Sequence, residues 1–145
     1  MELCAEVEIE GSPAPLWEHI TRGDLLHEWS PFLTSLTTPL PASGAVQLGA
    51  SPPNSRELHL TPRVDRLHPG EELHLVGTLV HARVLTYAFS VQLTPLSEDS
   101  TRVLYRATAT GWLLPFLGPL LTAVARGLAF QCQALKRRAE GTARA

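Results

Sequence analysis

The chain has 145 residues, of which 44% are hydrophobic, and a formal net charge of −2. This length suits one domain with a hydrophobic core of ordinary size, and we expect residues 1–145 to form it. The near-neutral charge argues against nucleic acid as a partner, because that would require a basic face matched to phosphates.

Metal-binding and targeting motifs are missing from the sequence. The two cysteines, Cys4 and Cys132, lie far apart, and neither they nor the six histidines show the spacing of a metal site. We therefore expect no metal and no cofactor. The first residues include several glutamates and lack the basic start and apolar core of a secretory signal, so we expect a cytoplasmic protein.

The first third of the chain predicts one strand and two short helices. Apolar residues alternate with glutamates over residues 3–9, which indicates a half-buried strand. Ser12 followed by Pro13 is typical of a helix start. Gly23 interrupts the apolar stripe, which then continues at near-helical spacing until Pro31 and so predicts a second short helix.

From residue 33 onward the pattern changes to strands separated by short turns. Turn-forming residues gather at 39–44, 51–54 and 68–70. The clearest alternation covers residues 85–93, and residues 103–109 repeat it on the next strand. Strands of this regularity joined by turns predict an antiparallel meander.

The last part of the chain predicts a long helix over about residues 113–140. Apolar side chains occupy two neighbouring faces of this helix, so it must be covered on more than one side, and a curved sheet is the only partner large enough. The apolar run 112–125 is shorter than the roughly 20 residues that a membrane span needs. Because Pro115 and Pro119 also interrupt it, we expect an irregular first turn and no stable membrane insertion.

Several short sequence features follow the order expected of a known fold. They are Pro15, Leu16 and Trp17; Glu28, Trp29, Ser30, Pro31 and Phe32; Leu73, Leu75 and Gly77; Phe89, Leu93 and Pro95; Thr101, Arg102 and Val103 leading to Gly111; and residues 134–140. The chain thereby resembles the START and birch-pollen-allergen-like (SRPBCC) superfamily, in particular its polyketide cyclase/dehydrase branch. The resemblance covers nearly the whole chain.

The resemblance implies an α+β helix-grip fold: a curved antiparallel sheet of about seven strands, in the order β-α-α-β6-α, wrapped around the long C-terminal helix. It also implies a cavity between sheet and helix for lipids, polyketides or similar apolar molecules. The residues expected to contact such a ligand are Trp29, Phe32, Leu75, Tyr87, Phe89, Tyr105, Ala107, Val124 and Leu128. Many relatives have a polar or acidic group where this chain has Ala107, which weakens the case for acid or base catalysis.

Three functions are compatible with these sequence features. A carrier or sensor of an apolar small molecule fits best, because the expected cavity wall lacks a matched acid and base. A polyketide cyclase or aromatase is the alternative, with Tyr87 or Tyr105 orienting a ligand oxygen. The third is an interaction module that uses residues 112–121 as an exposed apolar patch. A homodimer through an exposed sheet edge is compatible with each of the three.

Overall fold

The structure is a computed structural model that describes every residue except 39, 80, 82 and 145. In chain order its elements are β1 (Glu2–Glu10), α1 (Pro13–Thr21), the 3₁₀ helix η1 (Gly23–Glu28), β2 (Leu33–Leu36), β3 (Gly44–Ala45), β4 (Leu48–Ala50), β5 (Leu58–Leu60), β6 (Arg63–His68), β7 (Glu72–Leu79), β8 (Leu85–Ser97), β9 (Ser100–Thr110), the 3₁₀ helix η2 (Leu114–Phe116) and α2 (Gly118–Arg144).

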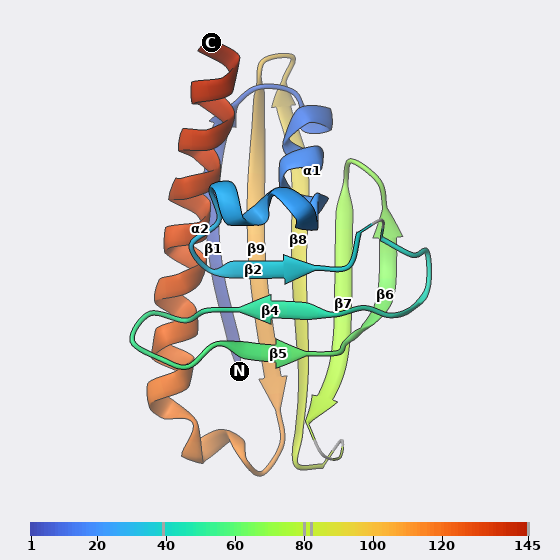
Figure 1. Cartoon of the computed structure of the whole chain (residues 1–145), viewed down its shortest axis with the longest axis vertical. Helices are drawn as coiled ribbons and strands as arrows, with labels where there is room; N and C mark the ends of the chain where they lie inside the picture. Colours follow the sequence, from blue (N-terminus) through green and yellow to red (C-terminus); the bar gives the residue numbers. More distant parts are fainter. Residues whose placement is uncertain (39, 80, 82, 145) are drawn as a thin grey trace.

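The strands form two antiparallel sheets. Six strands pair in the order β1-β9-β8-β7-β6-β3, and three pair in the order β2-β4-β5. The three short strands run across the view of Figure 1, at a large angle to the long strands. The predicted fold class is confirmed, but the expected single sheet is divided in two. The chain crosses between the sheets more than once, because β3 belongs to the six-stranded sheet although it lies between β2 and β4. Pro62 lies at the last crossing, between β5 and β6, where proline has no amide hydrogen to donate to a ladder.

The helical segments differ from the predicted ones at their ends. The second short helix is a 3₁₀ helix that ends at Glu28, so Phe32 lies just before β2 rather than on a helix. The predicted irregular first turn of the long helix is the 3₁₀ helix η2, and α2 itself starts at Gly118. Pro119 then lies in the first turn of α2, where a missing amide hydrogen costs nothing. No helix in the described part of the chain has the length and hydropathy needed to cross a membrane.

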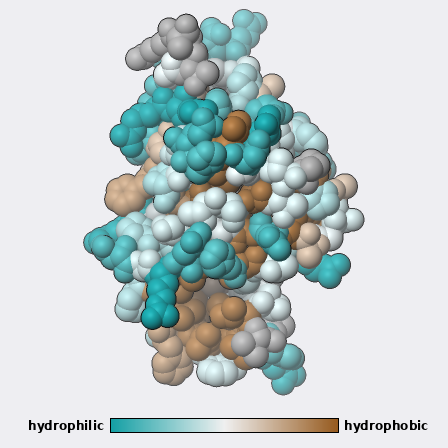
Figure 2. Space-filling model, viewed as in Figure 1, coloured by the Kyte–Doolittle hydropathy of each residue, from teal (hydrophilic) through white to brown (hydrophobic). Residues whose placement is uncertain are grey.

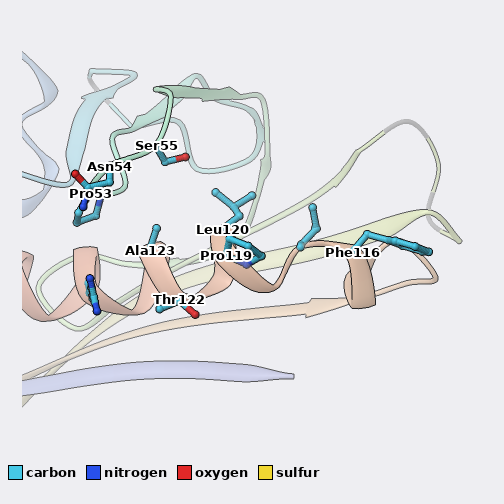
Figure 3. Close-up of a pocket in the computed structure, with 10 residues that line it drawn as sticks. Pro53, Asn54, Ser55, Phe116, Pro119, Leu120, Thr122 and Ala123 are labelled. Atoms are coloured by element: carbon cyan, nitrogen blue, oxygen red, sulfur yellow. The ribbon is translucent and has the colours of Figure 1, made fainter.

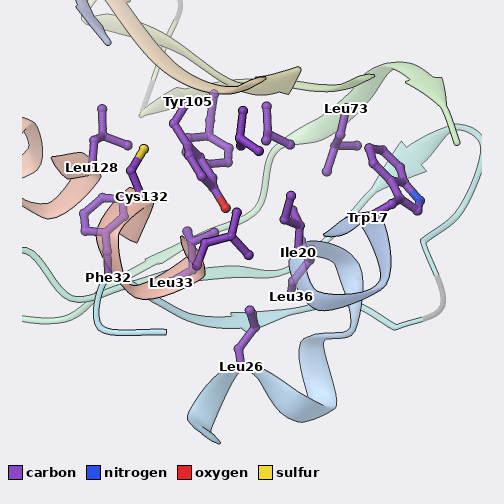
Figure 4. Packing of buried hydrophobic residues seen from close by; sticks show 14 of the residues in the cluster. Trp17, Ile20, Leu26, Phe32, Leu33, Leu36, Leu73, Tyr105, Leu128 and Cys132 are labelled. Carbon is purple, nitrogen blue, oxygen red and sulfur yellow. The ribbon is translucent and has the colours of Figure 1, made fainter. Parts of the chain in front are cut away.

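The half of the molecule that carries α1 and η1 contains a continuous hydrophobic core. Helix α2 packs mainly along β1, and α1 closes the space between α2 and the end of β8 (Figure 1). Ile20, Leu26, Leu73 and Leu135 are almost completely buried there. Figure 4 shows the first three among the side chains of this core. Burial of each such side chain contributes about 2 kcal/mol, so this packed half fixes the position of α2 against the sheet.

We expect Leu135→Ala to lower the free energy of unfolding by about 2 to 5 kcal/mol, because it leaves a cavity in the packed half. Phe130, on the same helix, is 53% exposed, and Phe130→Ala should change that energy by less than about 1 kcal/mol. Urea unfolding followed by circular dichroism measures both. Equal losses in the two variants would show that α2 is not anchored as described.

Candidate ligand-binding cavity

The other half of the space between sheet and helix is hollow. A cavity of about 330 Å³ lies between the six-stranded sheet, the three-stranded sheet and the first turns of α2. Leu48 on β4 and Leu58 and Leu60 on β5 line it from the three-stranded sheet. Leu121 and Val124 line it from α2. The wall is therefore built chiefly from aliphatic and aromatic side chains, which suits an apolar ligand.

Polar side chains contribute to the cavity mainly at its rim. Glu57 and His59 flank Leu58, and their carboxylate Oε2 and ring Nε2 lie 3.8 Å apart. The Glu57 carboxylate also accepts a hydrogen bond of 2.6 Å from Thr34 Oγ1. The side chains of Glu57 and His59 are both well exposed to solvent. In the described residues, no three His, Cys, Asp or Glu side chains gather as a metal site would require.

Tyr87 brings a phenol to the cavity wall. It lies directly opposite Gly77 on the neighbouring strand β7, and the end of its ring occupies the space that a side chain at Gly77 would fill. The absence of a Cβ at Gly77 therefore lets the ring lie across β7. Partial burial raises the pKa of Tyr87 above its ordinary value, so this phenol stays protonated at neutral pH and can donate a hydrogen bond.

Aromatic rings separate the cavity from the packed core. The Phe32 ring packs directly against the backbone of α2 at Gly127, where no Cβ stands in its way. Phe89 lines the cavity on one side and contacts Tyr105 on the other, with ring centroids 5.9 Å apart. Tyr105 itself is completely buried (Figure 4).

A buried carboxamide holds Phe32 in this position. Gln131 on α2 is completely buried. Its Oε1 accepts hydrogen bonds from Ser30 Oγ at 2.8 Å, from the amide of Phe32 at 3.2 Å and from the amide of Leu33 at 3.4 Å. The start of β2 is thereby tied to the middle of α2, and the two residues that follow Pro31 are fixed at the inner end of the cavity.

Two groups beside Gln131 resist ionisation. Within the described residues, neither the Tyr105 hydroxyl nor the Gln131 amide nitrogen makes a hydrogen bond. Burial raises the pKa of Tyr105, and the nearby Gln131 side chain offsets only part of this rise. Burial, with a smaller contribution from Glu6, raises the pKa of the Cys132 thiol to about 12. Both groups are neutral at physiological pH.

The residues expected from the sequence to contact a ligand fall into two groups. Phe32, Tyr87, Phe89, Ala107 and Val124 line the cavity. The remaining four, Trp29, Leu75, Tyr105 and Leu128, do not line it. The last three of these are fully buried in the packed core, and Trp29 is partly buried against it. Contact with a ligand stays a prediction for the five residues on the wall.

Sequence alternation did not predict the wall that the three-stranded sheet provides. Strands β4 and β5 contain three residues each, too few for alternation to identify an inward face. The sequence feature that indicates this wall is the pair Leu58 and Leu60, which flank His59 and precede Pro62.

A second hollow, of about 510 Å³, lies on the outer side of α2 (Figure 3). This outer groove runs between the loop that carries Pro53, Asn54 and Ser55 and the first turns of α2. It shares Leu117 and Leu120 with the cavity, and it also contains Arg126. The groove is thus continuous with the cavity wall but chemically different from it.

Large apolar side chains are exposed where α2 begins. Figure 2 shows hydrophobic residues gathered at this end of the molecule. Phe116 is 73% exposed and Trp112 is 62% exposed, whereas Leu113, Leu114 and other residues of the segment are partly buried. Only part of the segment 112–121 therefore forms the exposed patch expected of an interaction module.

Comparison with known proteins agrees with this architecture. A family model described as polyketide cyclase / dehydrase and lipid transport matches residues 2–140. None of the curated proteins matches the sequence. The Zhui aromatase/cyclase from Streptomyces has a similar structure, with a TM-score of 0.77 and 14% identity over 100% of this chain and 96% of that one.

Two further solved structures are similar over nearly their whole length. A protein from Mesorhizobium loti gives a TM-score of 0.74 at 19% identity, covering 98% of each chain. A START superfamily protein from Mycobacterium smegmatis gives 0.73 at 15% identity, covering 97% of this chain and 98% of that one. At such low identity these likenesses show the shared fold alone.

The buried phenol and thiol predict that stability declines at alkaline pH. Their pKa values are raised in the folded protein, so above about pH 9, the ordinary value for a thiol, the folded chain holds more protons than the unfolded chain. The stabilisation is complete below that pH and is lost as the pH rises toward the folded values, by on the order of 1 kcal/mol per pH unit for each group.

Urea unfolding at a series of pH values from neutral to about pH 11 measures this slope. Tyr105→Phe should flatten it, whereas Tyr87→Phe should change it less because Tyr87 is only partly buried. A slope that Tyr105→Phe leaves unchanged would contradict the burial of this hydroxyl.

Proposed function

The chain belongs to the polyketide cyclase/dehydrase and lipid transport family, as its sequence predicted, and on that premise we propose that it binds an apolar small molecule as a carrier or sensor. The observation that supports this function is the cavity of about 330 Å³, whose wall is aliphatic and aromatic. In a cavity with so few polar groups, the binding free energy comes mainly from removing apolar ligand surface from water.

The arrangement of the polar groups favours binding over catalysis. General acid–base chemistry needs a titratable group within hydrogen-bond reach of the reacting atoms. Glu57 and His59 are well exposed at the rim, and the thiol of Cys132 is buried with a raised pKa. Ala107 supplies only a methyl group to the wall. A ligand in the cavity would contact mainly apolar side chains, with few reactive groups within reach.

Filling the cavity should abolish binding without unfolding the protein. Ala107 lines the cavity from β9, and Ala107→Phe should weaken binding of the neutral fluorophore Nile red at least about tenfold, which corresponds to about 1.4 kcal/mol. Ala129 on α2 is exposed, so Ala129→Phe adds the same ring outside the cavity and should leave affinity unchanged. Fluorescence titration measures both affinities. Equal affinities in the two variants would place the dye elsewhere and remove the support for this function.

A polyketide cyclase or aromatase is the second candidate, because a protonated phenol lies on the cavity wall. Tyr87 lines the cavity, and it can donate a hydrogen bond to a carbonyl oxygen on which negative charge develops. The similar structure from Streptomyces is described as an aromatase/cyclase. The fold accommodates such a reaction, but fold alone does not supply it.

If this chain is a cyclase, Tyr87→Phe should abolish turnover of a poly-β-ketone substrate analogue and leave its binding intact. Tyr105→Phe should retain turnover, because the Tyr105 hydroxyl lies in the packed core away from the cavity wall. Product formation and equilibrium binding are measured on the same variants. Absence of turnover by the wild-type protein, with binding retained, would contradict the cyclase function and favour the carrier or sensor function over it.

A further inference from the structure

The cavity and the outer groove meet at one point on α2. Leu117 and Leu120 belong to the walls of both hollows. Both side chains are partly exposed, so neither is sealed inside the packed core. These two leucines stand between the cavity and the groove formed by the 53–55 loop and α2, which Figure 3 shows from the side, so a ligand that reaches from one hollow to the other passes them.

The outer groove differs from the cavity in its electrostatics. Arg126 is the charged residue in its lining, and Asn54, Ser55 and Thr122 add polar groups without any carboxylate. Arg126 is exposed, and no carboxylate of the described residues lies within 4 Å of its guanidinium. Because arginine remains protonated at all physiological pH values, the groove holds a permanent positive charge with no anion to balance it.

The cavity lining carries a negative charge at Glu57. Glu57 lies on the rim next to β5, and its Oε1 is held by the hydroxyl of Thr34 at 2.6 Å. A ligand anion would be repelled there and attracted toward Arg126. The charges therefore favour one orientation for an amphiphile whose apolar part lies between the two sheets.

We propose that the ligand is a long-chain carboxylate, with its hydrocarbon chain in the cavity and its head group in the outer groove on Arg126. This inference rests on the proposed binding function and specifies the ligand class. Arg126 is six residues beyond Leu120 on α2, a rise of about 9 Å along the helix, so a flexible chain can span the distance. One guanidinium matches one carboxylate, which it binds through two parallel hydrogen bonds.

A matched pair of probes tests the head group separately from the chain. The fluorescent polyene cis-parinaric acid carries a carboxylate, and its methyl ester has the same chain without the charge. The wild-type protein should bind the acid about tenfold more tightly than the ester, with an advantage that shrinks as salt is added because Arg126 is exposed. Arg126→Ala should weaken acid binding about tenfold and leave ester binding unchanged.

Arg137 provides the control, since it is exposed on the same helix and lines neither hollow. Arg137→Ala should change the affinity of neither probe, and circular dichroism should show both variants folded. Equal wild-type affinities for acid and ester, or equal effects of the two substitutions, would overturn the assignment of Arg126 while leaving the binding function standing. Failure of the wild-type protein to bind either probe would overturn the binding function and this inference together.

Discussion

The buried carboxamide of Gln131 is the interaction on which the rest of the architecture depends. Among the described residues the two sheets share no ladder, so the three-stranded sheet needs another attachment to the rest of the molecule. Gln131 Oε1 provides one by accepting hydrogen bonds from Ser30 and from the amides of Phe32 and Leu33. Each such bond contributes about 1 kcal/mol net, but leaving the three donors unsatisfied in the interior would cost about 1 to 3 kcal/mol apiece.

This attachment explains why one enclosed space is divided into a packed half and a hollow half. Beyond Gln131, toward the C-terminus of α2, side chains from α1, η1 and the sheet pack against the helix in the buried cluster. On the other side, the short strands β4 and β5 stand away from the long sheet and leave the cavity. The packed half supplies stability, and the hollow half is available for a ligand because the fold does not depend on filling it.

The sequence predicted the faces of the strands but not the depth of each residue within the fold. Alternation over residues 85–93 predicted Tyr87 and Phe89 on the inner face, because pleating sends successive side chains to opposite sides, and both residues line the cavity. Periodicity carries no information about position along the strand, so Leu75 and Tyr105 were expected beside a ligand and instead lie in the packed half. A single glutamine in an apolar helix gives no pattern at all, and the role of Gln131 emerged only from its contacts.

The contact between Phe32 and Gly127 has a consequence for how this scaffold can diversify. The ring at the inner end of the hollow leans on a backbone that offers no methyl group, and Gly127 itself is not part of the hollow's surface. The position of the Phe32 ring, and with it the length of this chamber, therefore depends on a helix residue, Gly127, that a ligand in the cavity would not contact. A side chain larger than hydrogen at this position would displace the ring from the helix and shorten the chamber.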